Sequence, residues 1–168
     1  MNGEDIRTMA LDELLPMVKS ELRANKLWRE EYDDEDSEWF RRTIHLIRQQ
    51  FVTLKDFSSQ GRAYFSDDFD FDETAVHQNL RQEPRLRELM NDLAGKLDAV
   101  EPFNAETSEA ALRAFADEAD VKADLLIDGA RTMLTGHAVG PSMFEIFDLL
   151  GREASVQRLR SGIPWNSM

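Results

Sequence analysis

The chain has 168 residues, of which 42% are hydrophobic, so it is long enough for one core or for two small packed helical layers. It contains no cysteine, which excludes disulfides, thiolate catalysis and cysteine-ligated zinc. No apolar run approaches the ~18 residues of a membrane span, and the start lacks the basic region of a secretory signal. We therefore expect a cytoplasmic protein without membrane contact.

The formal net charge of -13 is distributed unevenly along the chain. Residues 39–62 carry +4 and residues 129–168 carry +1, which leaves -18 for the remainder. Phosphate contacts usually require a basic footprint, and the total charge therefore argues against RNA binding. Because the local field steers a ligand, however, an acidic body with two acid-poor segments can dock RNA at one end.

Apolar residues with helical spacing predict a first helix over residues 11–22, with Pro16 near its first turn, where a missing N–H is tolerated. A second helix follows the acidic residues 33–36. Ser37 is the candidate cap of this helix. Its predicted core stripe consists of Phe40, Ile44, Ile47 and Phe51.

Thr53 and Asp56 have the spacing of a capping box, which predicts the start of a third helix there. Apolar spacing over residues 86–97 predicts another helix, which begins beside Pro84. No segment alternates with period two for long, so the predicted fold class is all-α.

Pro102 follows a helix end and precedes a new cap signal at Thr107 or Ser108. We therefore expect two lobes, residues 1–102 and residues 103–168. Further helical spacing continues to Gly151, which is placed like a C-cap.

The residue types that carry catalysis are scarce. The three histidines lack the spacing of a zinc helix, and no glycine-rich phosphate loop occurs. Residues 68–72 match the first ligands of a calcium loop, but Glu73 stands where the turn needs glycine and Asn79 where a bidentate glutamate is needed. The alternative is a solvated turn in which Asp72 caps the next helix. We expect no metal site and no enzymatic activity from this chain alone.

Several segments resemble one protein family. Residues 129–151 contain a helix that ends in Leu-Thr-Gly, a turn with Gly-Pro, and a helix that ends in Leu-Leu-Gly. This order resembles the C-terminal anticodon-binding domain of bacterial glutamyl-tRNA synthetases, a class I aminoacyl-tRNA synthetase family. Residues 51–57, 63–69 and 2–7 are similar to further segments of that family.

The resemblance implies a two-lobed, all-α anticodon-binding domain of the α-helix cage type, whose second lobe carries the Gly-Pro turn. The His-x-Gly-His and Lys-Met-Ser-Lys signatures of class I synthetases do not occur. The chain would then be the C-terminal portion of a glutamate-tRNA ligase, which orients tRNA for glutamylation by a catalytic domain outside this chain. The implied partners are the tRNA anticodon loop and the catalytic domain of the same polypeptide. We expect a monomer with no cofactor of its own, while ATP and Mg²⁺ are implied for the parent enzyme.

Candidate RNA contacts follow from the resemblance and from the chemistry of single-stranded loops, whose bases and phosphates are held by planar or polar side chains and by helix N-termini. Pro141 is predicted at a helix start, with exposed N–H groups beside it. The anticodon-binding candidates are Arg48, Gln49, Gln50, Arg131, His137, Gly140, Pro141 and Ser142, and the candidates for the RNA backbone are Arg41, Arg42 and Arg62.

Each candidate has an ordinary alternative. The Gly-Pro turn can be a plain helix connection, and residues 48–50 can be a solvated helix end. Arg41 and Arg42 can pair with the acids at 33–36 instead of RNA, and His137 can be a solvent-facing loop residue.

The chain departs from the family pattern at Gln50, where members that accept only glutamate tRNA commonly have arginine. A neutral amide and a charged guanidinium fork do not discriminate a base equally. We therefore expect relaxed discrimination of the third anticodon base, with acceptance of glutamine tRNA. The alternative function is an acidic helical protein-interaction domain with a basic partner.

Overall fold

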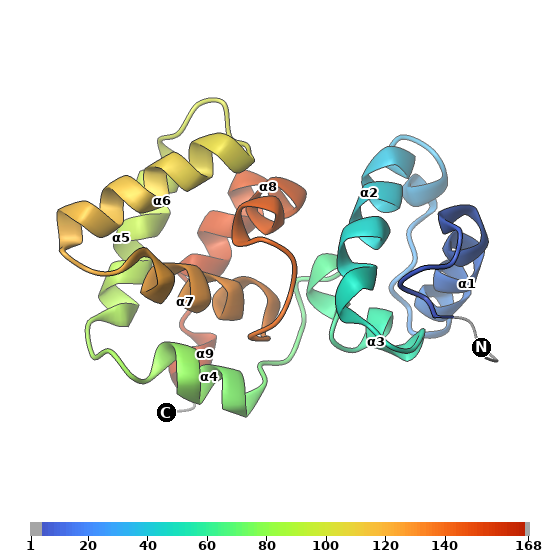
Figure 1. Cartoon of the computed structure of the whole chain (residues 1–168), viewed down its shortest axis with the longest axis horizontal. Helices are drawn as coiled ribbons and strands as arrows, with labels where there is room; N and C mark the ends of the chain where they lie inside the picture. Colours follow the sequence, from blue (N-terminus) through green and yellow to red (C-terminus); the bar gives the residue numbers. More distant parts are fainter. Residues whose placement is uncertain (1–4, 167–168) are drawn as a thin grey trace. The chain divides into compact units, whose positions relative to one another are not determined.

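The computed structural model describes residues 5–166, which form two compact units that divide between Phe69 and Asp70 (Figure 1). Within the described residues, all regular secondary structure is helical. This confirms the predicted all-α class.

The first unit consists of short helices joined by tight turns. They are α1 (Leu11–Ala24), η1 (Glu30–Asp33), α2 (Ser37–Ile47), η2 (Arg48–Gln50), α3 (Lys55–Ser58) and η3 (Arg62–Tyr64). The helix predicted from Thr53 is therefore only one α-helical turn followed by a 3₁₀ turn. Asp56 does accept hydrogen bonds from the backbone N–H groups of Val52 and Thr53, at 2.9 and 3.0 Å.

The core of the first unit lies where α1, α2 and α3 meet. All four residues of the predicted stripe in and after α2 are buried, as predicted: Phe40, Ile44, Ile47 and Phe51. Phe51 packs edge-to-face on Phe57, with ring centroids 4.9 Å apart. Pro16 lies beyond the first turn of α1, further inside the helix than we predicted.

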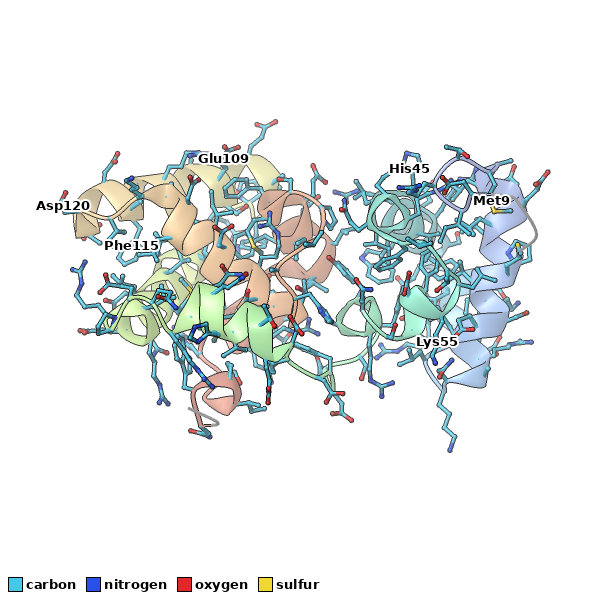
Figure 2. The ribbon with its side chains drawn as sticks, turned by 60° about the horizontal axis from the view of Figure 1, so that its bottom comes forward. Met9, His45, Lys55, Glu109, Phe115 and Asp120 are labelled. Atoms are coloured by element: carbon cyan, nitrogen blue, oxygen red, sulfur yellow. The ribbon has the colours of Figure 1, made fainter. Side chains whose placement is uncertain are left out.

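The second unit is a bundle of longer helices. They are α4 (Glu73–Leu80), α5 (Leu86–Asp98), α6 (Ala105–Ala119), α7 (Ala123–Thr135), α8 (Met143–Leu159) and α9 (Ile163–Asn166). The apolar side of α5 is buried as predicted, including Leu86, Leu89, Met90, Leu93 and Leu97. Phe115 of α6 is buried, whereas Glu109 of this helix and Asp120, its C-cap, project outward (Figure 2).

The lobe boundary that we expected at Pro102 lies inside the second unit. The reason is packing: α5 precedes Pro102, yet it contacts α6, α7 and α8, which follow it (Figure 1). A proline between two helices predicts a turn, but it does not reveal whether the helices on either side share a core.

The helix caps differ from prediction in three places. Ser37, the predicted cap of α2, is instead the first residue of the helix, and no side chain caps its N-terminus with a hydrogen bond. Asn104 caps α6, and Thr107 returns the bond as the second half of a capping box. Gly151 interrupts α8 with non-helical backbone angles, and a further helical segment, which we did not predict, follows it.

Among the described residues, no helix combines the length and the apolar character needed to cross a membrane.

Candidate nucleic-acid interface

The candidate contacts of the second unit gather in one turn between α7 and α8, here called the 136–142 turn. It begins where Gly136 ends α7 in the left-handed region, with φ of 80° and its N–H donating to the carbonyl of Thr132. Glycine adopts this conformation without a Cβ penalty, which explains the Thr-Gly that ends the helix. The turn ends at Ser142, the N-cap of α8. It therefore holds His137, Gly140, Pro141 and Ser142 together.

Pro141 does not occupy the helix start that we predicted. It precedes the N-cap Ser142, and its side chain is buried. The Ser142 hydroxyl accepts a hydrogen bond from Phe144 N–H at 3.3 Å. The predicted arrangement, with Pro141 opening the helix beside exposed N–H groups, is therefore wrong. Pro141 stiffens the entry to the helix, and the exposed Ser142 is the helix cap.

Local hydrogen bonds hold the start of the turn. The Thr135 hydroxyl donates to the Arg131 carbonyl at 2.8 Å and accepts from His137 N–H at 3.2 Å. The backbone N–H of Asp72 donates to the Gly136 carbonyl at 2.8 Å. These bonds therefore hold the first residues of the turn in place through contacts within the chain itself.

His137 is half-buried in this turn. Burial lowers the pKa of its imidazole from the ordinary 6.5, and the nearby Asp72 carboxylate partly opposes this change. The ring is therefore biased toward its neutral form, which offers one donor and one acceptor nitrogen. This surrounding differs from the fully solvent-facing loop histidine that was the alternative.

Asp72 joins α4 to the turn. Its carboxylate caps α4 by accepting from Ala75 N–H at 3.1 Å, which confirms the capping alternative to a calcium loop. No group of three or more His, Cys, Asp or Glu side chains within the described part of the chain could hold a metal ion. The role that the structure gives to Asp72 is that of a helix cap.

Arg131 lies in the last turns of α7, the helix that leads into the 136–142 turn, and its side chain reaches Pro141 in that turn. Its guanidinium donates to the Pro141 carbonyl at 3.4 Å and pairs with Asp128 at 3.4 Å, and its side chain is 15% exposed. Its Nε is buried without a hydrogen-bond partner. The buried Nε is out of reach of a ligand, so only the exposed part of the side chain is open to contact from outside.

The first unit carries its candidates at the end of α2, where residues 49–52, just after Arg48, form what we call the η2 tip. Gln49 is exposed and Gln50 is half-buried there. Val52, in the same tip, is 75% exposed. Amide side chains beside an exposed branched apolar group offer both hydrogen bonds and a contact surface to a planar base.

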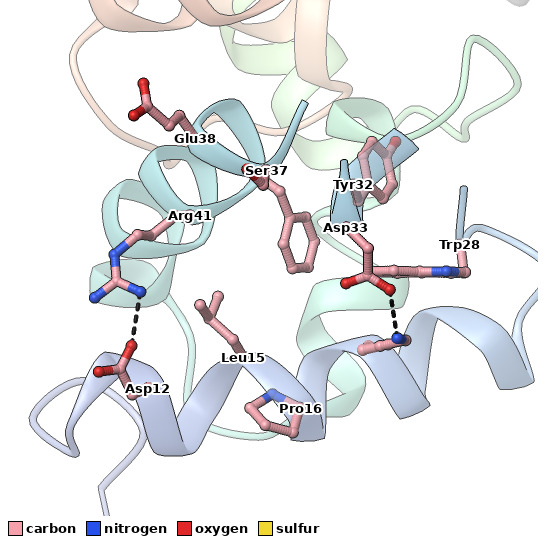
Figure 3. A pocket seen from close by; sticks show the side chains of 11 residues that line it. Asp12, Leu15, Pro16, Trp28, Tyr32, Asp33, Ser37, Glu38 and Arg41 are labelled. Atoms are coloured by element: carbon pink, nitrogen blue, oxygen red, sulfur yellow. Dashed lines mark hydrogen bonds and ion pairs between the residues drawn. The ribbon is translucent and has the colours of Figure 1, made fainter. Parts of the chain in front are cut away.

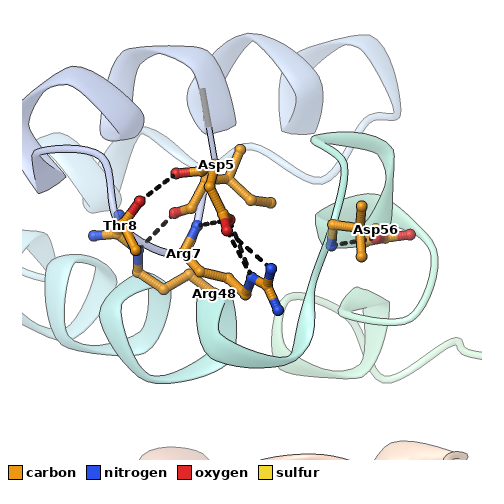
Figure 4. A network of polar contacts seen from close by, with 7 residues as sticks. Asp5, Arg7, Thr8, Arg48 and Asp56 are labelled. Carbon is orange, nitrogen blue, oxygen red and sulfur yellow. Dashed lines mark hydrogen bonds and ion pairs between the residues drawn. The ribbon is translucent and has the colours of Figure 1, made fainter. Parts of the chain in front are cut away.

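Arg48 does not belong to this surface. It is only 3% exposed, and its guanidinium donates to the carbonyls of Ile6, at 2.8 Å, and Met9 (Figure 4). Next to it, the Arg7 side chain donates to Asp5 and lowers the pKa of that carboxyl. The prediction that Arg48 faces solvent opposite the apolar stripe is wrong, because the N-terminal segment covers it. Arg48 fixes that segment to the η2 tip.

Two of the three backbone-contact candidates, Arg41 and Arg62, bond to partners within the first unit. Arg41 pairs with Asp12 at 2.7 Å and not with the acids at 33–36 that we named as alternative partners. The exposed Arg42 shares a shallow pocket of about 570 Å³ with Arg41, Trp39 and His45. Arg62 donates to the Asp68 carbonyl at 2.7 Å.

A second pocket of about 480 Å³ lies between α1, η1 and α2 (Figure 3). Trp28, Tyr32 and Phe40 line it, and an ion pair between Lys19 and Asp33, 2.6 Å long, closes one side. Tyr32 stacks on Phe40 with centroids 5.1 Å apart, and burial raises the pKa of its hydroxyl. The two cations that line this pocket, Lys19 and Arg41, already pair with carboxylates. The pocket therefore offers aromatic surface and little free charge.

Two exposed valines, Val52 and Val139, lie beside the polar candidates although no pattern in the sequence indicates them. Val139, in the 136–142 turn, is 67% exposed. Single exposed valines carry no recognisable pattern in a sequence. Their position, each beside polar candidates, is a property of the folded chain.

Comparisons with known proteins identify the family. Residues 10–163 match the family described as the anticodon binding domain. The glutamate-tRNA ligase of Desulfotalea psychrophila is 41% identical over 160 residues, which cover 95% of this chain and 33% of that protein. Glutamate-tRNA ligase 2 of Koribacter versatilis is 37% identical, with 95% and 32% covered.

The fold has a counterpart among solved structures. A glutamate tRNA ligase from Elizabethkingia meningosepticum, solved in complex with its amino acid, superposes with a TM-score of 0.74 at 21% identity, covering 92% of this chain and 29% of that one. The chain therefore belongs to the anticodon binding domain family, which confirms the resemblance in its sequence. It spans about one third of the length of the curated relatives that it matches.

Proposed function

We propose that this chain is the anticodon-reading portion of a glutamate-tRNA ligase and orients tRNA for glutamylation by a catalytic domain of the same polypeptide. The observation that carries the proposal is the 136–142 turn, whose start is held by hydrogen bonds within the chain and whose Pro141 carbonyl accepts from the partly exposed Arg131. Membership in the anticodon binding domain family supports it.

In this proposal both the 136–142 turn of the second unit and the η2 tip of the first unit contact the RNA. Arg131 turns toward an RNA phosphate or base edge, while His137, Gly140 and Ser142 present polar groups beside it. Gln49 and Gln50 offer amides to a base. Unstacked loop bases accept such contacts on their edges and faces.

Arg41, Arg42 and Arg62 are proposed to contact the RNA backbone. The exposed ion pair between Arg41 and Asp12 opposes this only weakly, because such pairs contribute about 0–1 kcal/mol. The shallow pocket beside Arg42 contains Trp39, so a base can stack near the phosphate contacts.

ATP and Mg²⁺ belong to the parent enzyme in this proposal. They would supply activation of the amino acid in the catalytic domain. This chain contributes only the placement of tRNA, as a monomer in the cytoplasm, and sedimentation of the purified chain tests the monomeric state.

Titration with an anticodon stem-loop tests the function. The logarithm of the affinity should fall with the logarithm of the salt concentration, with a slope of about -0.7 per neutralised phosphate on a single strand. Arg131→Met should weaken binding and reduce the slope by about 0.7. Arg113→Met is the matched control, because Arg113 likewise pairs with an acid one turn earlier, Glu109. The proposal fails if wild type does not bind, or if both variants behave alike.

Gln50 is proposed to relax discrimination at the third anticodon base, so that glutamine tRNA is accepted. The wild-type chain should bind stem-loops with glutamate and glutamine anticodons within about threefold, a difference below about 1 kcal/mol. Gln50→Arg should favour the glutamate sequence, whereas Gln49→Arg at the adjacent exposed position should not. A strong glutamate preference of the wild-type chain would refute this part alone.

The alternative, an acidic protein-interaction domain, predicts a different result. Binding of RNA should then be weak and without sequence preference. The same titration series separates the two functions.

A further inference from the structure

Two charged side chains are buried among the residues that the structure describes, Arg48 and Arg158, at 3% and 8% exposure. A guanidinium loses strongly favourable hydration on burial, and hydrogen bonds must replace it. Arg48 lies beneath the η2 tip and bonds to two carbonyls, as described above. Arg158 lies in the second unit, at the end of the helix that leads into the 136–142 turn.

Arg158 bonds to the end of the helix that leads into the 136–142 turn. Its Nη1 donates to the Leu134 carbonyl at 2.7 Å, and the bond is buried. The last carbonyls of a helix have no partner within it and form the negative end of its dipole. A buried guanidinium at this place satisfies one of these carbonyls and neutralises the dipole end. Arg158 therefore fixes the C-terminal end of α7, directly before the 136–142 turn.

A break in α8 brings Arg158 to this position. In an uninterrupted helix, Arg158 would lie about 24 Å along the axis from Ser142, at 1.5 Å per residue. Gly151 instead has φ of 84° and ψ of 170°, a region open essentially to glycine alone. The kink redirects the second half of α8, which carries Arg158 to the carbonyl at the end of α7.

We propose that Arg158 is a positioning residue for anticodon binding: it holds the end of α7, and through it the 136–142 turn, in the binding conformation without touching RNA. This inference rests on the proposed function of the turn. In a chain of net charge -13, Arg158 also places a positive charge under the surface offered to an anionic ligand.

The test compares Arg158→Met with Arg160→Met, its matched control. Arg160 is exposed and two residues further on, so both variants lose one positive charge from the same segment. Arg158→Met should lower the affinity for the anticodon stem-loop at least tenfold, and Arg160→Met less than twofold. The salt slope of Arg158→Met should equal that of wild type, because a residue that contacts no phosphate releases no counterion. Circular dichroism checks that each variant is folded.

Arg158→Lys keeps the charge but loses the planar fork, and it should fold where Arg158→Met does not. It should recover part of the affinity at an unchanged slope. An affinity of the folded Arg158→Met within twofold of wild type would overturn the proposal. A slope reduced by about 0.7 would also overturn it, since Arg158 would then contact phosphate directly.

Amide hydrogen exchange provides a second measurement that needs no RNA. Exchange of residues 136–142 should accelerate at least tenfold in Arg158→Lys, relative to Arg160→Lys, while α2 exchanges as in wild type. If the wild-type chain binds no stem-loop, the proposed function fails, yet this exchange still decides whether Arg158 holds the turn. Unchanged exchange in the turn would refute the positioning role.

Discussion

The burial of Arg48 can be tested by replacing it with methionine, which has a similar length and no charge. Arg48→Met removes the donors to the carbonyls of Ile6 and Met9 and leaves both without their partner. Two effects oppose each other. The variant no longer buries a charge, which favours it, but it leaves one buried and one part-buried carbonyl without a donor, which destabilises it.

The structure indicates which effect is larger. Hydrogen bonds from a charged donor contribute about 1.5–3 kcal/mol each, so two lost bonds cost about 3–6 kcal/mol. Relief of the desolvation of one guanidinium returns part of this. We therefore expect the free energy of unfolding of the first unit to fall by about 2–4 kcal/mol. Arg42→Met, on the exposed side of α2, should change it by less than about 0.5 kcal/mol.

Urea unfolding followed by circular dichroism measures the stability of both variants. Hydrogen exchange locates the change, because amides 5–9 should lose protection first in Arg48→Met. An Arg48→Met variant that is as stable as wild type and leaves the exchange of amides 5–9 unchanged would refute the assignment of Arg48 as the residue that holds the N-terminal segment.

Three further changes test other features of the second unit. Gly151→Ala should destabilise it by about 1–3 kcal/mol in urea unfolding, although an added Cβ meets nothing within 4 Å, since only the backbone conformation is strained; unchanged stability would contradict this. Asn104→Ala removes the capping box of α6 and should cost about 1 kcal/mol, whereas a loss near zero would show that the cap is dispensable. Because burial lowers the pKa of His137 in the folded chain, its stabilising contribution is present above the unfolded pKa of 6.5 and is lost as the pH falls through the folded pKa. His137→Gln should remove this part of the pH dependence, and an NMR titration that places the His137 pKa above 6.5 would refute the assignment.

Much of the fold could be predicted because helical periodicity is a local property. The stripe from Phe40 to Phe51 and the apolar side of α5 are buried as their spacing indicated. Each pattern needs only that one side of its helix faces a core, whichever core that is. The family could be recognised for a related reason, because residues 129–151 preserve the order of helix end, turn and helix.

The candidate site could be predicted only in part. His137 and Ser142 were expected together because they share one short turn. The part played by Asp72, far from them in sequence, could not be expected, since its bond to Gly136 depends on how α4 packs against α7.

The sequence by itself determined the all-α class, the approximate position of most helices and the family. Only the tertiary structure decided that Arg48 is covered by residues about 40 positions away, that Arg41 pairs with Asp12, and that α5 belongs to the second unit. The physical reason is that helix formation depends on neighbours within a few residues. The burial of a charge and the choice of its partner depend instead on which distant segments meet.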